Sequence, residues 1–295
     1  MIGPIFRAPR RAPRRTPLEP GTGRRAKNLL TDLFEYCVAP FARWEKETLV
    51  VERVEVRLTG LAPAFDGYRI AFLTDMHTSP LVPAWWLERA VEQALALKPD
   101  LIALGGDFLD DEPHYIATLA DILKPLHAPD GVVAVLGNHD HYVGAQGVRE
   151  ELKEAGVREL RNTAITLQRG DARLAIAGIG DLERDAIDFD AAVGAVGAEV
   201  PRIVLSHDPD VFAYWPSGLR LDLMLSGHTH GGQAWLPILG PPYVPSQFGF
   251  RYLHGLIREN NSQLYVSRGV GSSGVPMRWG CPPELTHLVL RSHHP

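Results

Sequence analysis

The stretch that decides the fold reads YRIAFLTDMH over residues 68–77, an apolar run that ends in a turn of polar side chains. Four later stretches repeat this pattern: LIALGGDFLD at 101–110, VVAVLGNHD at 132–140, IVLSHD at 203–208 and LDLMLSGHTH at 221–230. A helical pattern of apolar residues, at 83–97, lies between the first two. Short buried strands that alternate with helices predict a layered α/β fold around a largely buried sheet.

Each of the five runs carries potential metal ligands at its carboxyl end. In open α/β sheets, ligands bind outside the carboxyl ends of the strands, so we expect these side chains to lie together. The candidate metal ligands are Asp75, His77, Asp107, Asn138, His207, His228 and His230. Imidazole and carboxylate without thiolate suit Zn, Fe or Mn. Seven ligands are too many for one tetrahedral site, which predicts two metal ions (Mn, Fe or Zn, with manganese favoured).

Charge is distributed unevenly along the chain. The net charge is −5, but residues 1–27 carry eight Arg or Lys against one Glu, so this tail has a charge of +7 and the remainder −12. The tail is rich in Pro and Arg and has little apolar content, which predicts disorder. The acidic remainder argues against nucleic-acid binding, and we expect no specific nucleic-acid partner.

Residues 28–47 form an amphipathic segment, in which apolar residues recur at helical spacing from Asn28 to Trp44. One interpretation is a helix packed on the domain. The other is an interfacial helix that, with the cationic tail, brings residues 1–44 onto an anionic membrane. No run of eighteen apolar residues is present, so we expect no spanning helix. We expect a cytoplasmic protein, with peripheral contact at the inner membrane as the alternative, and a catalytic domain over 48–295.

The ordered motifs resemble a known family. Asp75-x-His77, Gly106-Asp107-x-x-Asp110, Gly137-Asn138-His139-Asp140, His207 and Gly227-His228-x-His230 are similar to the five-block signature of calcineurin-like metallophosphoesterases, over about residues 68–230. The part after the last block, from Gly231-Gly232-Gln233 to the stretch 264–290, resembles the bacterial YkuE/YaeI-like branch. One departure is the first block, which reads Asp-Met-His-Thr where that branch commonly has Asp-Leu-His-Leu-Gly.

The resemblance implies a fold and a set of roles. The fold is a two-sheet β-sandwich flanked by helices, in α-β-β-α layers. One metal is bound by Asp75, His77 and His230, the other by Asn138, His207 and His228, and Asp107 bridges both. Hydroxide between the metals attacks phosphorus, and His139 protonates the leaving oxygen. Asp140 orients the ring of His139, as a second carboxylate often does for a histidine.

The resemblance leads us to expect a phosphodiester, a pyrophosphate or a phosphomonoester as substrate, with preference for a nucleotide- or lipid-linked diester or pyrophosphate. Candidate substrate contacts are Arg268, Arg278 and His254, the last in a Pro-, Gly- and aromatic-rich stretch that could wall the site. Within enzymes the alternative is a UDP-2,3-diacylglucosamine pyrophosphatase-like role in lipid A synthesis. The alternative from another class is a catalytically silent interaction module with the same fold.

Overall fold

The computed structural model describes residues 48–235, 238–275 and 277–293. The predicted basic tail (1–27) and amphipathic segment (28–47) therefore lie outside the described residues. Within the described part, none of the helices combines the length and apolar character needed to cross a bilayer.

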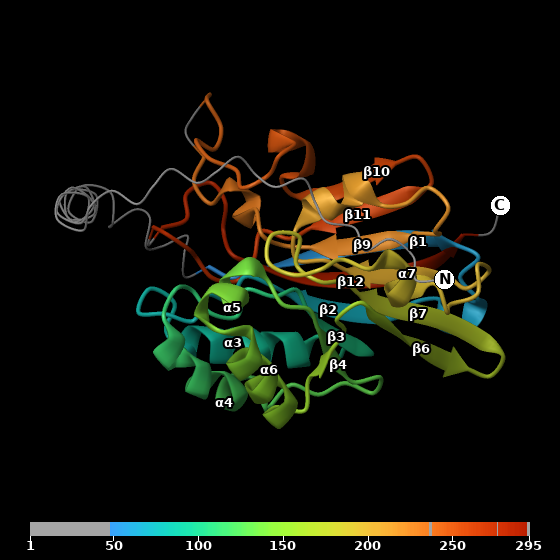
Figure 1. Cartoon of the computed structure of the whole chain (residues 1–295), viewed down its shortest axis with the longest axis horizontal. Coiled ribbons are helices and arrows are strands. Elements are labelled where there is room, and N and C mark those ends of the chain that lie inside the picture. Colours follow the sequence, from blue (N-terminus) through green and yellow to red (C-terminus); the bar gives the residue numbers. More distant parts are fainter. Residues whose placement is uncertain (1–47, 236–237, 276, 294–295) are drawn as a thin grey trace.

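Two six-stranded sheets form the centre of the molecule (Figure 1). The first has the order β1-β12-β2-β3-β4-β5, with bounds Val50–Thr59, Glu284–His293, Arg69–Leu73, Leu101–Leu104, Val132–Ala134 and Arg158–Glu159. The second has the order β10-β11-β9-β8-β7-β6, with bounds Gly255–Glu259, Ser262–Val266, Leu223–Ser226, Arg202–Leu205, Ala172–Gly178 and Thr163–Arg169. In the first sheet β12 pairs antiparallel with β2, while β2 to β5 are parallel. In the second β7, β8, β9 and β11 are parallel, and β6 and β10 are antiparallel to their neighbours.

Helices cover the outer face of each sheet. The α-helices are α3 (Ala84–Ala96), α4 (Leu119–Leu123), α5 (Asn138–Val143), α6 (Ala145–Glu154) and α7 (Phe189–Val193). Short 3₁₀ helices span Pro63–Phe65, Pro113–Thr118, Pro209–Tyr214, His230–Gly232 and Gly249–Tyr252. Figure 1 shows α3, α4 and α6 together on the side of the β2–β4 sheet. Apolar residues of α7 and of the 3₁₀ helix at 209–214 pack on the other sheet.

Strand β2 shows why the apolar runs are unbroken. Ile70 and Phe72 lie in the apolar cluster between the two sheets, whereas Ala71 and Leu73 lie in the cluster under the helices. A strand that is buried on both faces reads as a continuous apolar run, because alternate side chains point to opposite faces. The predicted α-β-β-α sandwich is confirmed.

Candidate metal centre

The seven candidate ligands follow the carboxyl ends of β2, β3, β4, β8 and β9. Strands from both sheets therefore deliver polar groups to one edge of the sandwich. The structure brings these side chains together in two buried groups, Asp75–His77–His230 and Asp107–His207–His228, each with ligand atoms within 4.8 Å of one another. Asn138 starts α5 beside the second group and lines the same pocket as Asp107 and His228.

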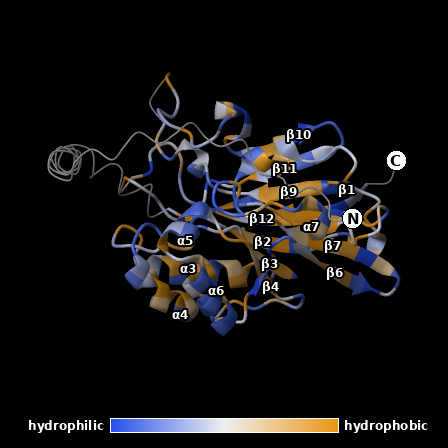
Figure 2. Cartoon of the chain, viewed as in Figure 1, coloured by the Kyte–Doolittle hydropathy of each residue, from blue (hydrophilic) through white to orange (hydrophobic). Residues whose placement is uncertain are grey.

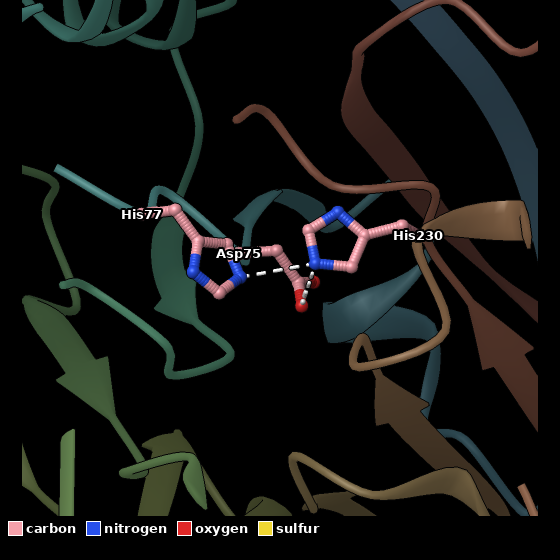
Figure 3. A group of neighbouring side chains, drawn as sticks. All are labelled: Asp75, His77 and His230. Carbon is pink, nitrogen blue, oxygen red and sulfur yellow. Dashed lines mark hydrogen bonds and ion pairs between the residues drawn. The ribbon is translucent and has the colours of Figure 1, made fainter. Parts of the chain in front are cut away.

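Figure 3 shows the first group. The rings of His77 and His230 face each other, with 3.0 Å between their Nε2 atoms. Nε2 of His230 lies 3.5 Å from Oδ1 of Asp75. All three side chains are buried, and burial raises the pKa of Asp75.

The second group has a defined tautomer at His207. Nδ1 of this ring lies 2.8 Å from the carbonyl oxygen of Gly105, which can only accept, so Nδ1 carries the proton. Nε2 faces the site, 3.0 Å from Oδ2 of Asp107 and 3.2 Å from Nδ1 of His228. A backbone carbonyl that fixes the far nitrogen in this way is typical of metal-binding histidines.

Asp107 lies between the two groups. Its Oδ2 is 3.0 Å from Nε2 of His207 and 3.6 Å from Nε2 of His77, which belong to different groups. Its Oδ1 accepts a 2.9 Å hydrogen bond from the backbone N–H of His139. Burial opposes ionisation, but the imidazoles of His207, His139 and His77 outweigh it and hold the pKa of Asp107 well below its usual range. This carboxylate therefore lies between the two candidate groups.

The backbone at the site is strained. Five of the seven candidate ligands have left-handed φ angles, between 48° and 69°: Asp75, His77, Asp107, His228 and His230. Such residues cost about 1–3 kcal/mol each and persist where function requires them. The strand ends also approach closely, since a Cβ at Gly137 would overlap the carboxylate of Asp107 and one at Gly227 would overlap that of Asp75.

The donor set fits metal ions. Asn138 Oδ1 and Asp75 Oδ2 are buried acceptors for which the described residues supply no hydrogen-bond donor. A buried acceptor of this kind is costly unless an ion or water satisfies it. Two Nε2 atoms at 3.0 Å share at most one proton when both rings are neutral, so a cation is a natural partner for the pair of His77 and His230.

A pocket of about 550 Å³ opens over both groups. Asp107, Asn138, His139, His228 and His230 contribute to its lining, and the rest comes from Tyr142, Glu183, Thr229, Gly232, Gln233, Ala234, Pro242, Tyr243, Pro245, Ser273, Gly274 and Val275. The sequence pattern did not indicate these wall residues individually. They belong to segments far apart in the chain, and only the folded topology brings them together.

Comparison with known proteins now decides the family, because residues 68–232 match the calcineurin-like phosphoesterases. The chain belongs to that family. Phosphodiesterase YaeI of Escherichia coli is 37% identical over 230 residues, 76% of this chain and 82% of that protein. The metallophosphoesterase YkuE of Bacillus subtilis is 32% identical over 257 residues, 85% and 89% of the two chains. A metallophosphoesterase of Aquifex aeolicus is 29% identical over 271 residues, 89% and 97%. The predicted family and branch are confirmed, and the protein is a metal-dependent phosphoric ester hydrolase.

The role predicted for Asp140 in this calcineurin-like site is wrong. Its carboxylate does not orient the ring of His139, because it accepts backbone hydrogen bonds of 2.9 Å from Asp107, Phe108 and Gly137. Asp140 thus holds the loop that carries Asp107. Burial, followed by the charge of Asp107, raises the pKa of Asp140 to about 7.

Other carboxylates contact the ring of His139 instead. Nδ1 of His139 lies 3.1 Å from Oδ1 of Asp111 and 3.7 Å from Oδ1 of Asp110. Asp110 also lies 3.2 Å from Nδ1 of His77, so one carboxylate serves two rings. Both carboxylates lie nearest Nδ1, so Nε2 is the nitrogen of His139 that these carboxylates leave uncovered.

Arg278 was predicted to contact phosphate, and the structure contradicts this. The side chain is fully buried. Its guanidinium donates to the carbonyl oxygens of Gly271 at 2.6 and 2.9 Å and of Arg268 at 2.7 Å, and Nη2 lies 3.2 Å from Nδ1 of His230. These donors face the backbone beneath the His230 loop. Arg278 therefore fixes that loop and is absent from the pocket lining.

Two further predicted substrate contacts lie outside the pocket lining. Arg268 pairs with Glu284 at 2.9 Å and with Glu52 at 3.2 Å, so two carboxylates already balance its charge. His254 is exposed, and its ring lies 6.0 Å from that of Trp235. The structure brings neither residue into the pocket, and substrate contact by either one stays a prediction.

Replacing Arg278 by alanine is expected to lower the free energy of unfolding by about 3 kcal/mol or more, because several buried carbonyls lose their donor. Urea denaturation followed by circular dichroism would measure the loss. Arg258→Ala removes an exposed arginine and is the matched control, with an expected change within about 0.5 kcal/mol. Equal stability of the two variants would contradict the role of Arg278 in fixing the His230 loop.

Asp181 is a buried residue of this phosphoesterase that the sequence pattern did not reveal. It follows the carboxyl end of β7 and is 2% exposed. Oδ1 accepts from the N–H groups of Glu183 and Arg184 at 3.0 and 2.8 Å, whereas the described residues provide no donor for Oδ2. Burial raises the pKa of Asp181 to about 7.

Asp181→Asn is expected to stabilise the metal-free protein at high pH. Between about pH 4 and 7 the folded wild type holds a proton that the unfolded chain has lost, so its stability falls as the pH rises through this window. The asparagine variant avoids this loss, and we expect its advantage to grow to about 2–4 kcal/mol above pH 7. Urea titrations in chelator from pH 4 to 8 would measure it. A stability difference that does not change with pH would contradict the shifted pKa.

Proposed function

We propose that this calcineurin-like enzyme hydrolyses phosphodiesters that carry an apolar or aromatic substituent, at a two-metal centre. In this proposal the first metal is held by Asp75, His77 and His230 and the second by Asn138, His207 and His228, with Asp107 between them. The observation that carries the choice of substrate is the lining of the pocket.

The described side chains that line the pocket offer no positive charge from lysine or arginine to a second phosphate group. Among the described residues, no lysine or arginine lines it, and the wall carries the carboxylate of Glu183. A phosphodiester has one negative charge, which a metal centre neutralises. A phosphomonoester or a pyrophosphate brings additional charge, and it would meet Glu183 instead of an arginine. This difference favours diesters over the pyrophosphatase alternative.

The walls suit an uncharged substituent. Tyr142, Pro242, Tyr243, Pro245 and Val275 line the pocket, and rings and aliphatic groups of this kind bind apolar or planar groups. Tyr142 is held in place, since its hydroxyl donates to Glu183 at 3.0 Å and Arg184 lies 4.3 Å above its ring. The name of the similar protein YaeI, a phosphodiesterase, is consistent with this substrate class.

The chain's own residues supply orientation and a proton. When bound, the metal ions would supply positive charge at the phosphoryl group and acidify water. His139 lines the pocket and has Asp111 at its Nδ1, so a proton at Nε2 is available to the leaving oxygen. The backbone N–H of His139 also holds Asp107, which ties the proton donor to the metal centre.

Steady-state kinetics with manganese test the proposal. We expect kcat/KM for bis(p-nitrophenyl) phosphate to exceed that for p-nitrophenyl phosphate by roughly tenfold or more, because one unit of unbalanced charge near a carboxylate costs at least about 1.4 kcal/mol. Glu183→Gln is expected to narrow this ratio by raising the monoester rate, and Glu150→Gln, a surface change on α6, is the matched control. A preference for the monoester in the wild-type enzyme would overturn the diester assignment.

A further inference from the structure

Large apolar side chains are exposed after the last ligand turn. In the segment 231–254, Ile238 is 106%, Leu239 78% and Tyr243 69% exposed, and in the segment 271–283, Val275 is 46% and Trp279 43% exposed. We call these five residues the apolar rim. Single exposed apolar residues are ordinary, but a contiguous group usually marks a contact surface.

The two segments that carry the rim are joined. Trp279 donates its backbone N–H to the carbonyl of Gln233 at 3.1 Å and accepts from the N–H of Trp235 at 2.8 Å. The side chain of Gln233 donates to the carbonyls of Ser273 and Val275 at 3.0 and 3.2 Å. This pairing holds both segments as one edge beside the ligand turn.

The rim is continuous with the mouth of the active-site pocket. Tyr243 and Val275 belong both to the rim and to the pocket lining. The loop between β9 and β10 projects from the two sheets in Figure 1, and hydrophobic colour marks its outer end in Figure 2. A surface covering this edge would therefore meet the pocket mouth.

The same region lacks the acidic residues that are frequent elsewhere. Residues 223–283 contain one acid, Glu259, and four arginines, although the whole chain has 35 Asp and Glu. Glu259 lies in the β10–β11 hairpin and pairs with Arg251 at 2.6 Å. The rim therefore has no neighbouring acid in its own segments to repel an anionic surface, in contrast to most of this acidic protein.

We propose that the apolar rim docks on an anionic lipid bilayer. Ile238 and Leu239 enter the boundary of the acyl chains, and Tyr243 and Trp279 lie at the level of the headgroups, where amphipathic rings are favoured. Docking turns the mouth of the pocket toward the headgroup layer. The surface is distinct from residues 1–44, and the docking does not depend on the substrate assigned above.

Vesicle sedimentation with the full-length protein tests this docking. Wild-type protein is expected to pellet with vesicles of phosphatidylcholine and phosphatidylglycerol, and less with phosphatidylcholine alone. The double substitution Ile238→Ser/Leu239→Ser is expected to lower the partition coefficient by roughly tenfold or more, because two aliphatic side chains no longer leave water. Trp85→Ser is the matched control: Trp85 is 54% exposed on α3 and belongs neither to the rim nor to the pocket lining.

The outcomes separate docking from catalysis. Both variants are expected to hydrolyse soluble bis(p-nitrophenyl) phosphate at the wild-type rate, since Ile238, Leu239 and Trp85 are all absent from the pocket lining. Equal vesicle binding by the wild type and the double variant would overturn the docking, as would absence of binding by the wild type. Sedimentation velocity without lipid gives a further test: a wild-type dimer that the double variant loses would identify the rim as a protein interface and overturn the lipid assignment.

Discussion

Replacing Asp107 by asparagine is expected to lower kcat/KM for bis(p-nitrophenyl) phosphate with manganese on the order of a thousandfold or more. The asparagine keeps an oxygen for the backbone N–H of His139 but loses the negative charge between His77 and His207. In the proposed two-metal centre Asp107 would help to hold both cations, so loss of its charge would weaken metal binding. Metal content measured by mass spectrometry is expected to fall together with the rate.

The control for this change is Asp171→Asn, which removes a carboxylate from the exposed β6–β7 turn. It is expected to keep the activity, the metal content and the melting temperature of the wild type. The charge argument would fail if Asp107→Asn retained full activity at full metal content. If the wild-type protein showed no activity and Asp107→Asn changed nothing, the silent interaction module would be favoured instead.

Most of the fold could be predicted where strands are buried on both faces. The runs at 69–73 and 101–104 coincide with β2 and β3, because burial on both sides leaves an uninterrupted apolar pattern. The hairpin of β6 and β7 was not predicted, since β6 is partly exposed along its length and alternates weakly. The position of β12 between β1 and β2 could not be predicted either, because β12 pairs with residues more than 200 positions earlier in the chain.

The candidate site was predictable to the extent that it depends on strand ends. Asp75, Asp107 and His207 each follow a strand by two or three residues, so topology alone brings them together. The direction of a side chain within a turn was not predictable. Asp140 turns back and accepts from the N–H of Gly137 at the start of α5, and Arg278 turns inward and donates to backbone carbonyls. The spacing of residues along the sequence does not reveal either direction.

His139→Gln is expected to slow hydrolysis according to the leaving group. With diphenyl phosphate the rate should fall by roughly a hundredfold or more, because phenolate is a poor leaving group that needs the proton of His139. With bis(p-nitrophenyl) phosphate the loss should be much smaller, since p-nitrophenolate is stable without protonation. Comparison of kcat for the two substrates in the wild type and the variant measures the difference.

The matched control is His114→Gln, which alters an exposed histidine on the 3₁₀ helix at 113–118 and should leave both rates unchanged. If His139→Gln slowed both substrates equally, the side chain of His139 would act by positioning the substrate and not by proton transfer. Asp111→Asn refines the test. Loss of the carboxylate 3.1 Å from Nδ1 should reduce the diphenyl phosphate rate more than the p-nitrophenyl rate, because the imidazolium that donates the proton is less well supported.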